Sequence, residues 1–158
     1  MKQPPFCTPG ERNDLGGHTF TAEEIIRFAK KYDPQPFHID EAAARASVLG
    51  GLCASGWHTA AVWMRKFRDF SEAAYAEWLA EGNPPYEMGP SPGFKNMRWI
   101  RPVYAGDTIS FANITHSWRA SASRPGWFVY TGIQEGVNQK GEPVFSFESA
   151  GFMRYPAE

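Results

Sequence analysis

The sequence has little of what marks secreted, membrane or nucleic-acid-binding proteins. Its 158 residues include only two cysteines, Cys7 and Cys53, and carry a formal net charge of −1. Two scattered cysteines build no disulfide framework and favour a reducing cytoplasm. The small net charge gives no sign of a nucleic-acid or anionic-membrane partner. No stretch approaches the roughly 20 apolar residues of a membrane span, and the opening MKQPPFCTPG lacks the apolar run of a signal peptide. We therefore expect a cytoplasmic protein.

Aromatic residues, in contrast, are abundant. They make up 15% of the chain, with six Trp and twelve Phe, so some are expected to line a pocket or a subunit interface. The length predicts a single domain over residues 1–158, large enough to bury a core. Residues 1–15 are punctuated by Pro and Gly and are expected to form an extended segment over the surface.

The first half of the chain predicts three helices. The side chains of Thr21 and Asp40 can cap the first two by accepting a backbone N–H, and Ser55-Gly56 opens the third. Glu24 would complete a capping box with Thr21 by reaching back to its amide. Pro34 ends the first helix, because a proline disfavours helical geometry in the residue before it.

The third helix, expected to continue to about residue 80, is unusual in its first turns. Residues 57–64, WHTAAVWM, are apolar on nearly every side and are therefore expected to be buried. After Phe94, four stretches rich in β-branched and aromatic residues are separated by turn signals. Helices followed by an antiparallel meander of about four strands predict an α+β fold whose sheet wraps the buried helix.

The stretch YDPQPFHID, residues 32–40, carries the clearest chemical signal. It places Asp33 and His38 around two prolines, where we expect neither helix nor central strand. Pro34 and Pro36 restrict φ and so would hold an acid/base pair in position. Taken alone, Asp33 before a proline is also typical of a helix-terminal turn.

With these residues in view, the chain resembles the MaoC-like dehydratase family, relatives of the (R)-specific enoyl-CoA hydratases, over about residues 17–152. The family motif D-x-N-P-x-H-x-D corresponds to DPQPFHID, which begins at Asp33, and the Gly that opens the family's central helix corresponds to Gly56. The later stretches RPVYAGD, SRPG and NQKGEPV are also similar. The resemblance implies a hot-dog fold, an antiparallel sheet wrapped around a long central helix. It also implies catalytic roles for Asp33 and His38, without a metal or redox cofactor.

Three positions depart from the family pattern. Gln35 stands where the motif has Asn, and Ser55 stands where a His precedes the glycine. Met64 corresponds to a polar Ser in the central helix of some hydratases, which suggests a different acyl chain.

The chemistry that the resemblance implies is the reversible hydration of an enoyl thioester to its 3-hydroxyacyl form. A neutral His38 can take a proton from water while Asp33 orients that water. The backbone N–H of Gly56, at a helix N-terminus, can stabilise the negative charge that develops on the thioester oxygen. The substrate partner would be acyl-CoA or acyl carrier protein, and the protein partner a second copy in a homodimer or a dimer-based higher oligomer.

Other interpretations stay open at this point. A hot-dog thioesterase and a non-catalytic acyl-thioester binding module are the alternative functions.

Several single residues also have alternative roles. Asp40 is expected to be an N-cap. Cys53 is either a reactive thiol or a small buried apolar residue. His58 lines the pocket or is a hydrogen-bonded core histidine. Ser55 and Trp57 are further pocket candidates, although Trp57 also suits the core.

Overall fold

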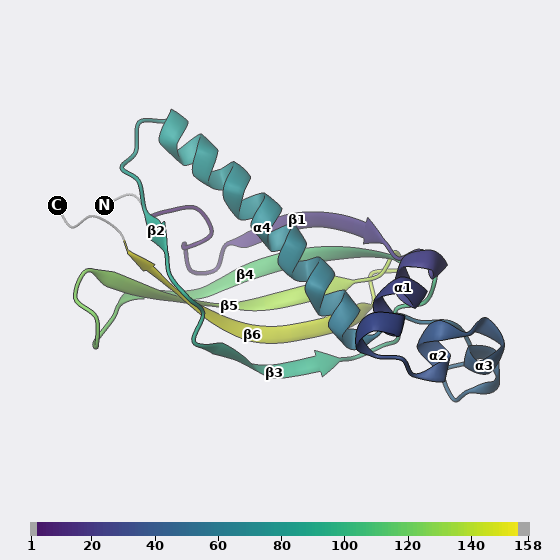
Figure 1. Ribbon diagram of the computed structural model, residues 1–158. Coiled ribbons are helices and arrows are strands. Elements are labelled where there is room, and N and C mark those ends of the chain that lie inside the picture. The colour runs from purple at the N-terminus through teal and green to yellow at the C-terminus, as the bar shows by residue number, and fades with distance from the viewer. Residues whose placement is uncertain (1–2, 155–158) are drawn as a thin grey trace.

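The computed structural model describes residues 3–154 and shows one antiparallel sheet crossed on one face by a long helix (Figure 1). The helices are α1 (Ala22–Tyr32), α2 (Pro36–Ile39), α3 (Glu41–Ala46) and α4 (Gly56–Ala80). The strands are β1 (Arg12–Thr19), β2 (Glu87–Met88), β3 (Gly93–Trp99), β4 (Thr108–Ala120), β5 (Trp127–Val137) and β6 (Pro143–Arg154). This arrangement confirms the predicted α+β hot-dog fold.

The strand order is β1-β4-β5-β6, with β2 and β3 both paired to the far side of β6. Strands β4, β5 and β6 form the expected antiparallel meander. The first strand of the predicted four-strand meander corresponds to β3. It does not join the meander as predicted, because β3 pairs with β6 and not with β4. Residues 100–107 carry the chain from the β6 side of the sheet to the strand beside β1, so neighbours in sequence are not neighbours in the sheet.

The structure confirms the predicted N-caps at Thr21 and Asp40 and the end of the first helix before Pro34. The Thr21 hydroxyl accepts the Glu24 N–H at 3.3 Å, and α1 ends at Tyr32, before the proline. Asp40 accepts the Ala43 N–H at 2.7 Å and caps α3, as predicted. The predicted capping box is only half formed, because the Glu24 carboxylate instead lies 2.6 Å from His18 Nε2.

Helix α4 is less buried at its start than its composition predicts. Trp63 and Phe67 face the core, but Trp57 and Met64 are 53% and 50% exposed. The prediction that all of residues 57–64 are buried was therefore wrong. The sheet covers only one side of a helix, so the opposite side stays open in a single chain. Figure 1 shows α4 lying obliquely over the sheet with helices α1–α3 gathered beside its N-terminal end.

The N-terminal segment is more than a surface cover. Phe6 is buried, and its ring packs edge-on against Phe67, Phe70 and Tyr130. Regular strand structure begins at Arg12, inside the segment expected to be extended over the surface. Residues 1–2 and 155–158, the two ends of the predicted domain, lie outside the described residues. Within residues 3–154, no helix is long and apolar enough to cross a membrane.

Candidate active site

Three segments meet at the N-terminal end of α4: the end of α1, the single turn α2 and the residues just before α4 (Figure 1). Asp33 is the C-terminal cap of α1, and His38 lies in α2. The segment around the two prolines was expected to contain no helix, and this was wrong for Pro36–Ile39. Pro36 occupies the first position of α2, where its missing N–H costs no helical hydrogen bond.

The ring of His38 is buried and held by the backbone. Its Nδ1 lies 2.6 Å from the carbonyl oxygen of Cys53. A carbonyl oxygen can only accept, so Nδ1 carries the hydrogen. In the neutral ring the lone pair is therefore on Nε2, which lies 3.5 Å from Asp33 Oδ2. This tautomer leaves Nε2 able to accept a proton on the side that faces Asp33.

The carboxylate of Asp33 is hydrogen-bonded at both oxygens. The Ser55 hydroxyl donates to Oδ2 at 2.7 Å, and the Gln35 amide donates to Oδ1 at 2.9 Å. Burial raises the pKa of Asp33, but the hydrogen bonds from Ser55 and Gln35 and the charge of His38 together lower that pKa below its ordinary value. Asp33 is therefore ionised at neutral pH.

Ser55 and Gly56 form the start of α4. The Ser55 hydroxyl accepts the Trp57 N–H at 3.3 Å, so the same oxygen caps the helix and contacts Asp33. Gly56 is the first helical residue, and its N–H has no acceptor within the helix. A Cβ built on Gly56 would lie 2.3 Å from the indole of Trp99. Any other residue at position 56 would have to displace that indole.

A hollow of about 410 Å³ joins these groups. Its lining combines five of the predicted site residues, Asp33, His38, Ser55, Gly56 and Trp57, with Tyr32, Gln35 and Trp99. A neighbouring hollow of about 290 Å³ shares His38, Gly56 and Trp99 and is bordered by Arg101. Asp33 and His38 are thus open to a ligand from the side of the α4 N-terminus.

Two other predicted residues lie elsewhere. His58 is buried in the core, stacked on Phe28 with ring centroids 4.5 Å apart and edge-on to Phe20. Burial lowers the pKa of His58 to about 4, so it is neutral at pH 7. Met64 lines a separate cavity of about 220 Å³ between α4 and the sheet. Trp57 borders both this cavity and the hollow with the acid/base pair.

The structure does not support a reactive thiol at Cys53. The side chain is buried, and burial raises its pKa to about 11. A thiol protonated at neutral pH is a poor nucleophile. Nor do any three His, Cys, Asp or Glu side chains within residues 3–154 lie close enough together to hold a metal ion.

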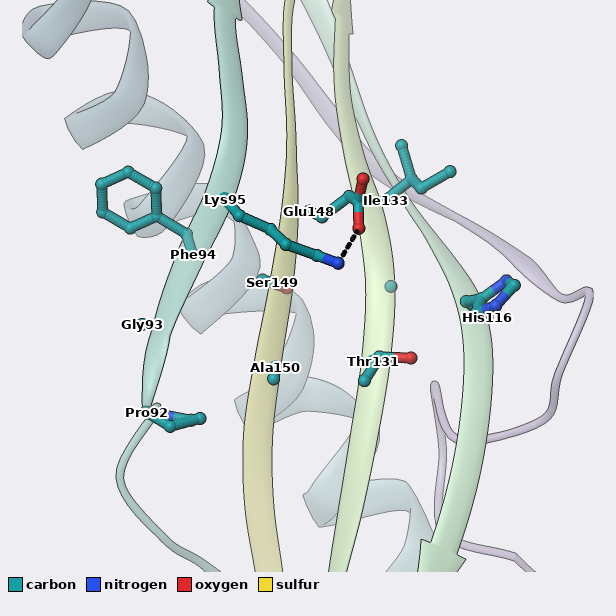
Figure 2. A pocket seen from close by; sticks show the side chains of 11 residues that line it. Pro92, Gly93, Phe94, Lys95, His116, Thr131, Ile133, Glu148, Ser149 and Ala150 are labelled. Carbon is teal, nitrogen blue, oxygen red and sulfur yellow. Dashed lines mark ion pairs between the residues drawn. The ribbon is translucent and has the colours of Figure 1, made fainter.

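A larger hollow, about 590 Å³, lies on the sheet and away from this site (Figure 2). Its side chains come from β3, β4, β5 and β6. Lys95 and Glu148 form an ion pair at 3.2 Å across it. His116, on β4, lies two strands away from Glu148, on β6. The charges of Lys95 and Glu148 neutralise each other, and both side chains of this pair are exposed to solvent. Its size alone therefore does not make it the active site.

Sequence reasoning missed one residue of the site and the role of another. Trp99 ends β3, far along the chain from residues 33–57, and no local pattern indicates that its indole lies against Gly56. In the sequence, Gln35 is only a departure from the family motif. In the structure its side-chain amide donates a hydrogen bond to the Asp33 carboxylate. A polar residue two positions after Asp33 is within reach of its carboxylate, which is the signal that could have found it.

Comparison with known proteins identifies the family of the chain. Residues 7–122 match the family described as MaoC like domain. The MaoC-like dehydratase from Rhodospirillum rubrum is 34% identical, with 95% of each chain covered and a TM-score of 0.76. The (R)-hydratase from A. caviae involved in PHA biosynthesis shares the fold at 18% identity, with 94% of this chain and 97% of that chain covered and a TM-score of 0.62. An uncharacterized protein of Bacillus subtilis (strain 168), YdeM, is 28% identical over 126 residues, 80% of each chain. The chain belongs to the MaoC-like dehydratase family.

Proposed function

We propose that this protein reversibly hydrates an α,β-unsaturated acyl thioester to the 3-hydroxyacyl form, as a hydro-lyase that uses Asp33 and His38. The observation that carries the proposal is the orientation of the two side chains. His38 Nε2, free to accept a proton, lies 3.5 Å from Asp33 Oδ2 in a hollow open to a ligand. Membership of the dehydratase family supports the same reaction class.

The separation of the two atoms suits a bound water. At 3.5 Å they are too far apart for a good direct hydrogen bond, and both can accept from one water. As the water oxygen bonds to the β-carbon of the substrate, its proton passes to Nε2. The proton that the Asp33/His38 pair has taken from this water is then delivered to the α-carbon, so one water is added overall and the dyad regains its starting state.

The amide of Gly56 is the proposed donor to the thioester oxygen. That oxygen gains negative charge as the β-carbon is attacked, and the N-terminal end of α4 favours negative charge. The side of Gly56 that would carry a Cβ is covered by Trp99, which is 48% exposed.

Incubation with crotonyl-CoA tests the function directly. We expect the enoyl absorbance to fall without release of free thiol, because hydration leaves the thioester intact. Release of thiol would identify a thioesterase. Binding of the thioester with neither change would identify a binding module. Acyl-carrier-protein thioesters in the same assay would distinguish the two carriers.

The cavity bordered by Trp57 and Met64 is the proposed site of the acyl group. It is lined almost entirely by apolar side chains, among them Trp63, Phe67 and Phe147. Its volume of about 220 Å³ exceeds the roughly 150 Å³ of an engineered protein cavity that binds benzene. A short chain or a group about the size of one ring is therefore expected to fit. Rates for acyl-CoA substrates of increasing length would measure the limit, and a rate that rises with long chains would exclude this cavity.

The protein is further proposed to work as a two-fold symmetric homodimer or a dimer-based higher oligomer. Strand β3 has a strand partner on one side only within residues 3–154, and unpaired edges are usually covered. Large apolar side chains on or next to β3 and on α4 are exposed as well, namely Trp57, Met64, Phe94, Trp99 and Ile100. Joining two β3 edges would bury this surface and place each active site beside the partner chain.

Size-exclusion chromatography with light scattering at micromolar concentration measures the assembly. We expect at least twice the chain mass of 17.7 kDa. A monomer of 17.7 kDa that still hydrates substrate would rule out both the dimer and a site completed by the partner.

The proposed compartment is the cytoplasm. Cys7 and Cys53 are both free and buried, as suits a reducing environment. Cell fractionation would test this, and recovery from the periplasmic or extracellular fraction would contradict it.

A further inference from the structure

Two neutral side chains hold the Asp33 carboxylate, one at each oxygen. Ser55 Oγ donates to Oδ2 at 2.7 Å, and Gln35 Nε2 donates to Oδ1 at 2.9 Å. We infer, resting on the proposed function, that Ser55 and Gln35 are positioning residues that keep Asp33 charged and turned toward His38. They are the two positions near the dyad at which the sequence departs from the family motif, so the inference concerns what is particular to this chain.

Ser55 suits this task because a hydroxyl has one hydrogen to donate and two lone pairs that accept. The hydrogen goes to Asp33, and a lone pair accepts the Trp57 N–H at 3.3 Å. One atom thereby connects the carboxylate of the dyad to the first turn of α4. Gly56, the proposed oxyanion donor, is the next residue. Ser55 therefore fixes the position of the Asp33 carboxylate relative to the Gly56 amide.

Gln35 restricts the rotation that Ser55 alone would allow. The terminal torsion of an aspartate has a broad, roughly two-fold profile, so its two oxygens can exchange places. Oδ2 is the oxygen that both faces His38 Nε2 and accepts from Ser55. With a separate donor on Oδ1, such an exchange would have to break two hydrogen bonds at once.

The charges around Asp33 are few. His38 on α2 is the nearest titratable group, and the last turn of α1 carries Lys30 and Lys31. Tyr32 is a further titratable residue that lines the hollow, and the other lining residues, Gln35, Ser55, Gly56, Trp57 and Trp99, are uncharged. Hydrogen bonds to a charged form favour that form, so loss of a donor raises the pKa of Asp33.

Ser55→Gly is the variant that separates positioning from folding. Glycine caps a helix almost as well as serine, at a cost of a few tenths of a kcal/mol, but it has no hydroxyl to donate. We expect kcat to fall roughly 10–100-fold, the equivalent of one hydrogen bond to a charged group, with KM little changed. The pKa of the Asp33 carboxyl should rise. Ser55→Thr, which keeps the hydroxyl, should restore both.

Two further variants complete the design. Gln35→Met removes the donor to Oδ1 at nearly constant size and should lower kcat and raise the pKa of Asp33, as Ser55→Gly does. Thr21→Gly removes the cap of α1, which contacts Glu24 and not Asp33, so it serves as the matched control. It should leave kcat and the pKa of Asp33 unchanged.

A measurement without substrate distinguishes this inference from the proposed function. The side-chain carboxyl of Asp33 can be titrated by ¹³C NMR in the wild type and in Ser55→Gly. A higher pKa in the variant supports the inference, whatever the substrate proves to be. Equal titration curves would overturn it, even if the variant turned over slowly. A wild type that hydrates no enoyl thioester would instead count against the function.

Discussion

Asp33→Asn and His38→Ala are each expected to lower turnover by about 10²–10⁴-fold, the usual contribution of a positioned acid or base. Asparagine keeps the shape of Asp33 and can still accept from Ser55, but it loses the negative charge. Alanine at position 38 removes Nε2 altogether. Steady-state kinetics with crotonyl-CoA measure the loss, and circular dichroism checks that the fold survives.

Two companion variants sharpen this test. His38 is buried and donates to the Cys53 carbonyl, so alanine there leaves a small void and an unpaired acceptor. His38→Gln fills more of that space and serves if the alanine variant is unstable. Asp40→Asn is the control, because Asp40 lies two residues from His38 but caps α3, a role that asparagine also fills. A folded Asp33 or His38 variant that hydrates at the wild-type rate would remove these residues from the mechanism.

Gly56→Val should damage activity far more than stability. A β-branched side chain would displace Trp99 and fill the approach to the amide where the thioester oxygen is expected to bind. Loss of one oxyanion donor typically costs about 10²–10³ in kcat. Forced repacking of this kind typically costs about 1–3 kcal/mol in the free energy of unfolding. Kinetics and denaturant unfolding of the same preparation compare the two.

A second substitution at Trp99 distinguishes the two ways in which Gly56→Val could lower activity. If the loss came only from displacing the indole, Trp99→Gly in the Gly56→Val background would restore activity. If the side chain at position 56 blocks the amide itself, the double variant stays inactive. Gly51→Ala is the control, since a Cβ there would meet Tyr104 at an ordinary 3.5 Å. Full activity in Gly56→Val would move the oxyanion donor to another amide.

The parts of the molecule that short-range chemistry determines could be predicted from the sequence. Thr21 and Asp40 cap their helices because a side chain three residues from an amide reaches it in any protein. Pro34 ends α1 for an equally local steric reason. Asp33 and His38 are only five positions apart, and the resemblance to the MaoC-like dehydratase family was needed to predict them as a pair.

What depends on distant contacts could not be predicted. The pairing of β3 with β6 is set by the path of residues 100–107 and by burial across the whole sheet. The placement of Trp99 against Gly56 follows from that pairing. The carbonyl that orients His38 belongs to the backbone of Cys53, and no residue type signals the direction of a backbone carbonyl. The exposure of Trp57 and Met64 could not be predicted either. Composition shows that a helix is apolar, but it does not show how many sides of the helix a sheet covers.

The pairing of β1 with β4 has a consequence for any attempt to divide the protein. Residues 33–57 supply nearly all of the side chains around the dyad, so a short N-terminal fragment would contain them. Yet Phe6 and Thr115, 109 residues apart, are joined by a hydrogen bond, and β1 has its only strand partner within residues 3–154 in β4. Such a fragment would leave the inner face of α4 without a sheet and β1 without a neighbour. The candidate site residues lie mostly in the first part of the chain, but the sheet behind them is completed only by the last three strands.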